Sequence, residues 1–161
     1  NVEDDSVEEY LKIYTLLDRD EVEKLMNEFQ DNEDMRIAQK KLAYEVTKTV
    51  HGISQANSAV KVTEILFESS DYSGLNTDEI DLLKDAFVSV EAKEGDHLIE
   101  ILTAGNMASS KGEARRLLEQ KAIKLNGETI EADYAIKDTD KIAQNSAVLK
   151  KGKNNFAVIT L

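Results

Sequence analysis

The sequence from residue 96 to residue 131, DHLIEILTAGNMASSKGEARRLLEQKAIKLNGETIE, decides how the second half of this chain is expected to fold. Its first residues predict a short apolar helix. Ser110 and Glu113 have the Ser-x-x-Glu spacing of a capping box, which predicts the start of a second helix. The apolar side of that second helix is predicted to consist of Ala114, Leu117 and Leu118.

A hairpin is predicted directly after this second helix. Asn126-Gly127, placed between apolar residues, is a strong signal for a two-residue turn. Lys111 and Arg115 are one helical turn apart and therefore share a face of the helix. The stretch thus predicts a small platform of helix, basic helix and hairpin, with cations on one side.

This stretch resembles a known RNA-binding module. The segments ASSKGEARRLL (108–118) and IKLNGE (123–128) are similar to the S-four-like RNA-binding domain, which is named after a small-subunit ribosomal protein. The resemblance implies that structured RNA is bound by the second helix and the adjoining hairpin.

The charge of the chain is distributed unevenly. The formal net charge of −12 resides in residues 1–93, which hold 22 acidic and 10 basic residues, whereas residues 94–161 hold 10 of each. A basic patch in this neutral half can still neutralise phosphates, so the overall charge does not exclude RNA. The absence of cysteine excludes disulfides and thiol catalysis.

Residues 1–88 are predicted to form an all-α bundle. Helices are expected over 6–17, from 18 onward, over 35–50, and in two further segments, with a polar break at 31–34. Capping boxes are expected at Ser6/Glu9 and Asn76/Glu79, and Gly52 is expected to cap the C-terminus of the helix over 35–50. The inner face of the first helix is expected to carry Tyr10, Ile13, Tyr14 and Leu17, and the bundle core to include Met35, Leu42 and Val46.

The predicted fold class is α+β. The bundle is followed by a linker at 89–95 and an S-four-like domain at 96–161, which ends in two strands. No apolar run approaches the roughly 20 residues needed to cross a bilayer, so we expect no membrane partner. We expect a cytoplasmic location, with which the absence of cysteine is compatible. The acidic start without methionine suggests a piece of a longer protein.

The whole chain is similar to the region that follows the catalytic domain in bacterial-type tyrosyl-tRNA synthetases. The segments VEEYLKIYTLL (7–17), AQKKLAYEVTKTVHG (38–52), TEILF (63–67) and LKKGKNNF (149–156) carry this resemblance in the family's order. The run EVTKTVHG is its most specific part.

The resemblance implies a tRNA-binding function. Neither a His-Ile-Gly-His nor a Lys-Met-Ser-Lys-Ser type motif occurs, so the fragment should hold no cofactor and be inactive alone, whereas the parent enzyme uses ATP and magnesium. The implied partners are tyrosine tRNA and the chain's own catalytic domain, with a monomeric fragment and a homodimeric parent. Some apolar residues of the first helices would then be exposed. The implied RNA-binding residues are Lys111, Arg115, Arg116, Lys124, Asn126, Lys150, Lys151 and Lys153.

Other interpretations remain open from the residues alone. The cations could be a solvated helix face, and Phe156 and Tyr134 are expected to be core residues. The two histidines are too far apart to predict a metal site, and no acidic stretch has the EF-hand spacing. The chain could instead be a stand-alone RNA-binding or ribosome-associated factor, or an acidic helical adaptor that binds basic proteins.

Overall fold

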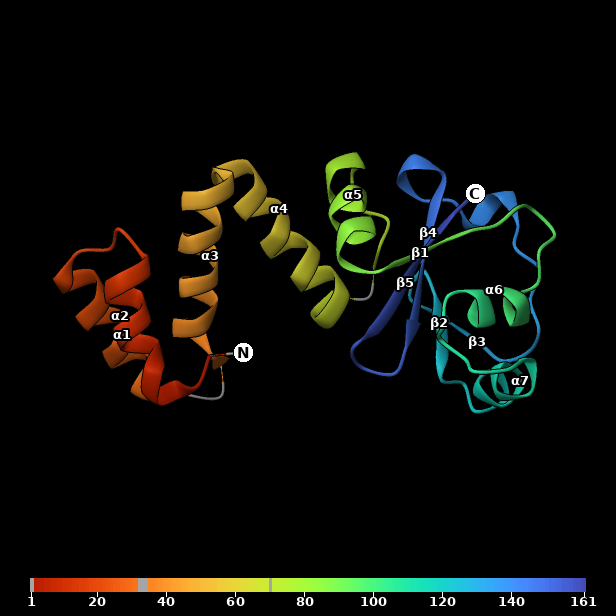
Figure 1. Ribbon diagram of the computed structural model, residues 1–161, viewed down its shortest axis with the longest axis horizontal. Helices are drawn as coiled ribbons and strands as arrows, with labels where there is room; N and C mark the ends of the chain where they lie inside the picture. Colours follow the sequence, from red (N-terminus) through yellow and green to blue (C-terminus); the bar gives the residue numbers. More distant parts are fainter. Residues whose placement is uncertain (1, 32–34, 70) are drawn as a thin grey trace. The chain divides into compact units, whose positions relative to one another are not determined.

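The computed structural model describes residues 2–31, 35–69 and 71–161 (Figure 1). The chain divides into two compact units, residues 1–60 and residues 61–161. The first unit is helical and the second combines helices with a five-stranded sheet, so the predicted α+β class is confirmed. Within the described residues, no helix is long and apolar enough to cross a membrane.

The helical unit is built from α1 (Asp4–Tyr14), α2 (Arg19–Asp31), α3 (Ile37–His51) and the first part of α4 (Ile53–Glu64). α3 packs against both α1 and α2. Apolar residues at helical spacing meet in one core, which consists of Val7, Leu11, Val22, Phe29, Ala38 and Leu42. The unit thus buries one stripe from each of its first three helices.

α1 differs from the prediction at its start and in its buried face. The helix begins at Asp4, after an N-cap residue that makes no side-chain capping bond, so the capping box predicted at Ser6 and Glu9 is wrong. Two acidic residues in the first turn favour this earlier start through the helix dipole. The buried face carries Val7 and Leu11, and the predicted inner residues Tyr10, Ile13 and Tyr14 are exposed.

The other helix ends follow the sequence more closely. The Glu21 N–H donates to Asp18 Oδ1 (2.8 Å) and the Asp18 N–H donates to Glu21 Oε2 (2.9 Å), which forms a capping box before α2. Gly52 ends α3 at φ 88°, as predicted.

Met35 is 60% exposed, so its assignment to the core is wrong. Most of the predicted polar break lies at 32–34, outside the described residues.

A buried carboxylate organises the middle of α3. Glu45 is 5% exposed and accepts hydrogen bonds from Lys41 Nζ (2.8 Å) and Lys48 Nζ (3.0 Å). These bonds, the Lys41 bond most of all, hold the pKa of Glu45 below its ordinary value against the opposing effect of burial. The adjacent Tyr44 hydroxyl donates to Asn57 Oδ1 (3.1 Å), which joins α3 to α4.

The second unit is built around a sheet with the strand order β1-β5-β4-β2-β3. Its strands are β1 (Val88–Glu91), β2 (Ile123–Leu125), β3 (Glu128–Ile130), β4 (Ser146–Lys151) and β5 (Asn155–Thr160). β1 is parallel to β5, and the other pairs are antiparallel. Asn126 and Gly127 both adopt positive φ in the β2–β3 turn, as the sequence predicted.

Helices cover both faces of this sheet (Figure 1). α6 (Leu98–Ala104) and α7 (Lys111–Glu119) pack on one face with Leu149 and Ile159. The last turns of α4, a π-helical turn η2 (Ile65–Ser69) and α5 (Thr77–Ala86) supply the other core, with Val148 and Phe156. Alternate residues of β4 and β5 therefore enter two different cores.

This double packing changes the expected domain boundary. The structure groups residues 61–87 with the sheet, whereas the sequence predicted that they belong to the bundle. The segment expected to be a linker at 89–95 includes most of strand β1. Gly105, at the end of α6, allows β1 to lie close, because a Cβ there would meet Val90 Cγ2 at 2.9 Å. A strand of four residues is too short to show a clear alternation in the sequence.

The connection between α4 and α5 is fixed by hydrogen bonds to one buried carboxylate, that of Glu79. Asn76 and Glu79 form the predicted capping box through bonds of 2.8 and 3.0 Å. Glu79 is buried and also pairs with Lys61 Nζ (2.9 Å), which additionally donates to the Gly74 carbonyl. Tyr72 belongs to this connection, and its side chain is 1% exposed.

The first prediction concerns the Tyr72 hydroxyl. Its oxygen is buried and makes no hydrogen bond to any described residue, and burial raises the pKa of Tyr72. Because an unpaired buried hydroxyl costs about 1 kcal/mol or more, Tyr72→Phe should raise the free energy of unfolding by about 1 kcal/mol. Urea denaturation measures this change, with Tyr134→Phe as the control, because that hydroxyl donates to Asp140. A destabilised Tyr72→Phe protein would contradict the prediction.

The second prediction concerns the charge of Glu45. Glu45→Gln should lower the free energy of unfolding by about 1 kcal/mol at pH 7, a value discounted because both lysine partners are partly exposed. Since the folded state lowers the pKa of Glu45, this stabilisation is present above about pH 4.5 and lost as the pH falls through the folded-state pKa. The stabilities of the two proteins should therefore converge in acid, and a constant difference down to about pH 2 would refute the electrostatic explanation.

Candidate nucleic-acid interface

The start of α7 is fixed by two serines. Ser110 Oγ accepts a hydrogen bond from the Glu113 N–H (3.2 Å), as predicted. The reciprocal bond differs from the prediction, because the Glu113 carboxylate accepts from the N–H (2.6 Å) and hydroxyl of Ser109 instead of from Ser110. The Ser109 bonds, with smaller effects of Lys151 and Arg116, hold the pKa of Glu113 below its ordinary value.

α7 presents two arginines to solvent. Ala114 and Leu118 are buried against the sheet, which leaves Arg115 and Arg116 on the exposed side of the helix. Neither arginine forms an ion pair within the described residues. Lys111 differs from them, because its Nζ lies 2.7 Å from Glu100 Oε1. Arginine is well suited to phosphate because its planar donors can bind two oxygens at once.

Asn126 has a structural role in the hairpin. Its side-chain amide donates to the Asp140 carbonyl (2.6 Å), and its side-chain oxygen accepts from the Val148 N–H (2.8 Å). Its φ of 49° is one that asparagine tolerates better than most residues. The family resemblance implied an RNA contact for Asn126, but both polar ends of its side chain are already used within the protein.

Lys124 and Lys150 lie on the face of the sheet opposite to α7. They are direct cross-strand partners in β2 and β4, so their side chains share one face. Lys150 Nζ donates to the Leu66 carbonyl (2.7 Å) in η2 and lies 5.0 Å from the centre of the Phe156 ring. Burial, and then the charge of Lys124, lower the pKa of Lys150.

Lys151 and Lys153 belong to the β4–β5 hairpin. Lys151 Nζ donates to the Met107 carbonyl (2.5 Å) just before α7, on the side opposite to Lys150. Lys153 is exposed in the turn at 152–154 and has no ion pair or hydrogen bond among the described residues. The hairpin thus places one lysine beside α7 and one at its tip.

The structure divides the predicted cations into two groups. Around α7 lie Lys111, Arg115, Arg116 and Lys151, whereas Lys124 and Lys150 lie on the other face. The alternation of Leu125 and Leu149 with these lysines was visible in the sequence, but the helices that cover each face were not. Sequence reasoning also missed Phe67, which lies in η2 beside the Lys150 contact and is 49% exposed.

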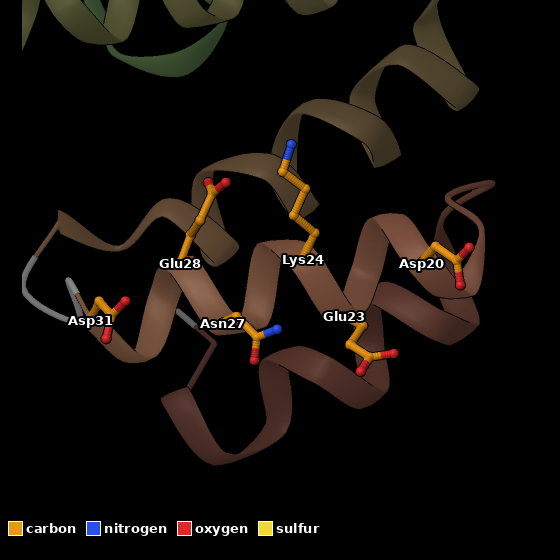
Figure 2. A pocket seen from close by; sticks show the side chains of 6 residues that line it. All are labelled: Asp20, Glu23, Lys24, Asn27, Glu28 and Asp31. Atoms are coloured by element: carbon orange, nitrogen blue, oxygen red, sulfur yellow. The ribbon is translucent and has the colours of Figure 1, made fainter.

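A surface hollow lies in the helical unit, on α2 (Figure 2). Its six lining residues are spread along this one helix: Asp20, Glu23, Lys24, Asn27, Glu28 and Asp31. Four carboxylates and one lysine would repel phosphate, so this hollow is unsuited to RNA. The described part of the chain also brings together no cluster of three residues fit to hold a metal ion.

The chain is similar to known tyrosine–tRNA ligases. It is 34% identical over 163 residues to the Tyrosine--tRNA ligase of Streptococcus suis and 35% identical to that of Streptococcus thermophilus, covering 99% of this chain in each case. The chain spans only 39% of the length of these curated relatives. A C-terminally truncated Aspergillus nidulans mitochondrial tyrosyl-tRNA synthetase is 37% identical over 42% of this chain and 19% of its own, with a TM-score of 0.41.

A family model places the chain more specifically. The model described as "Tyrosine--tRNA ligase SYY-like C-terminal domain" matches residues 79–159. This match begins within α5 and includes the whole sheet, except for the last residue of β5, together with α6 and α7. The chain therefore belongs to the family of tyrosine–tRNA ligase C-terminal domains.

Proposed function

We propose that this chain is the tRNA-binding portion of a tyrosine–tRNA ligase and docks tyrosine tRNA by its phosphates on the cations of the second unit. The observation that carries the proposal is the pair Arg115 and Arg116, which are exposed, adjacent and without ion-pair partners among the described residues. The charges of Arg116 and Lys151 both lower the pKa of Glu113, and Lys151 Nζ donates to the Met107 carbonyl, so Lys151 of the β4–β5 hairpin lies near the start of α7. Together with Lys151, and with Lys153 at the tip of this hairpin, the two arginines make up the proposed docking surface, which we call the α7 surface.

The two units would have different roles in this proposal. The α7 surface supplies electrostatic positioning, which requires no particular base. The helical unit has more acidic than basic residues, an excess that disfavours phosphate and thereby limits non-specific binding. The family resemblance suggests that this unit addresses the anticodon side of the tRNA. Amino-acid activation, with ATP and magnesium, would belong to a separate catalytic domain. That domain would also form the homodimer, and the parent enzyme would act in the cytoplasm.

The third prediction tests the α7 surface directly. Arg115→Gln, Arg116→Gln and Lys153→Gln, combined in one protein, should weaken binding of a tyrosine tRNA transcript by about tenfold or more at about 0.1 M salt. The slope of log K against log salt should become shallower by about one for each phosphate that the variant no longer neutralises. Fluorescence anisotropy across a salt series, beside a non-cognate tRNA, measures both quantities.

The matched control removes the same number of cations from the helical unit. Lys12, Arg19 and Lys24 are all exposed, and their combined change to glutamine should leave the affinity and the salt slope unchanged. Equal losses of affinity in both triple variants would contradict a localised interface. Equal binding of both tRNAs would indicate a generic S-four-like RNA-binding module, and no binding by the unaltered chain at low salt would leave the acidic adaptor as the better interpretation.

A further inference from the structure

Phe67 is an aromatic ring held in place with much of its surface open to solvent. It lies in η2 and is 49% exposed. Its ring meets that of Phe156 edge-on, with the ring centres 5.5 Å apart and the planes at 85°. Phe156 is buried and also packs against Phe87, at 5.2 Å. Phe67 therefore stands on a fixed aromatic base, although a single exposed ring is not by itself a binding site.

A second observation at the same place is a pair of like charges. Lys150 Nζ contacts both the Leu66 carbonyl and the Phe156 ring, so it is held next to the backbone of Phe67. Lys124 lies directly opposite Lys150 in the sheet, an arrangement that is unfavourable for two cations. Within the described residues, neither lysine has a carboxylate partner.

The chemistry of this cluster selects one kind of ligand. A fixed, half-exposed aromatic ring can stack on the face of a nucleobase, and two unneutralised ammonium groups can bind a phosphate. The Leu66 carbonyl uses only one of the three protons on Lys150, so the others can donate to a phosphate oxygen. The bases of a duplex are stacked on each other, whereas an unpaired nucleotide has a free face.

We propose that Phe67, Lys124 and Lys150 form a binding site for one unpaired nucleotide of the RNA, with its base stacked on Phe67 and its phosphate held by the two lysines. The proposal rests on RNA binding by this chain, and it adds a site on the sheet face opposite to the α7 surface. The α7 surface would position the RNA by its backbone, and the Phe67 site would require a strand that is not base-paired.

The fourth prediction compares variants at Phe67 in the full chain. Phe67→Ala and Phe67→Leu should each weaken binding of the tyrosine tRNA transcript by about tenfold, because the leucine is apolar but cannot stack. Phe67→Tyr keeps the ring and should bind within about twofold of the unaltered chain. None of these changes should alter binding to a fully paired RNA duplex. Val88→Ala is the matched control, since Val88 is an apolar residue of the same unit with similar exposure (46%).

The lysine pair provides an independent measurement. Lys124→Gln should weaken tRNA binding and reduce the salt slope by about one, while urea denaturation without RNA shows no loss of stability, because a repulsion has been removed. Unchanged tRNA affinity in Phe67→Ala and Phe67→Leu would overturn the stacking site. An equal loss of duplex binding in these variants would also overturn it, because a duplex offers no free base.

The same experiment separates this site from the proposed function. The variant with Arg115, Arg116 and Lys153 changed to glutamine can lose affinity for tRNA while the Phe67 variants do not. That result would support tRNA docking on the α7 surface and refute the nucleotide site at Phe67. If the unaltered chain binds no RNA at low salt, both proposals fall together.

Discussion

The structure of the second unit depends on burying the strands β4 and β5 on both faces. Leu149 and Ile159 enter the core under α6 and α7, whereas Val148 and Phe156 enter the core under η2 and α5. A strand with only one covered face would leave half of these apolar side chains in water, at a cost of about 25 cal/mol for each Å². This requirement draws the end of α4 and the whole of α5 into the sheet domain.

The packing of helices on both faces of the sheet also determines which surface each lysine of β4 can reach. Neighbouring residues of a strand point to opposite faces, so Lys150 and Lys151 are held by backbone carbonyls on opposite sides of the sheet, at Leu66 and Met107. Lys150 and Lys151 are adjacent in the sequence, but their side chains therefore lie on two different surfaces. Only the turn residue Lys153 lies outside this division, at the tip of the hairpin.

The sequence predicted most of the features that depend on local chemistry, although the capping box at Ser6 and Glu9 was wrong. The capping residues Ser110 and Asn76, the glycine end of α3 and the Asn126-Gly127 turn were all identified, because each needs only a few adjacent residues. It missed the features set by tertiary packing: the strand β1, the buried face of α1 and the exposure of Phe67. The run EVTKTVHG suggested the family, and its Glu45 also has a structural role. The Glu45 carboxylate is buried and accepts hydrogen bonds from two lysines.

The most direct test of this account is to map the contact on the full chain by backbone amide NMR while tyrosine tRNA is added. The account predicts that signals of the exposed side of α7 and of the turn at 152–154 change first and most strongly at low RNA concentration. Signals of α2, whose surface is acidic, should stay in place. Changes confined to residues 1–60, with α7 and the turn unaffected, would contradict the claim that the cations of the second unit dock the RNA.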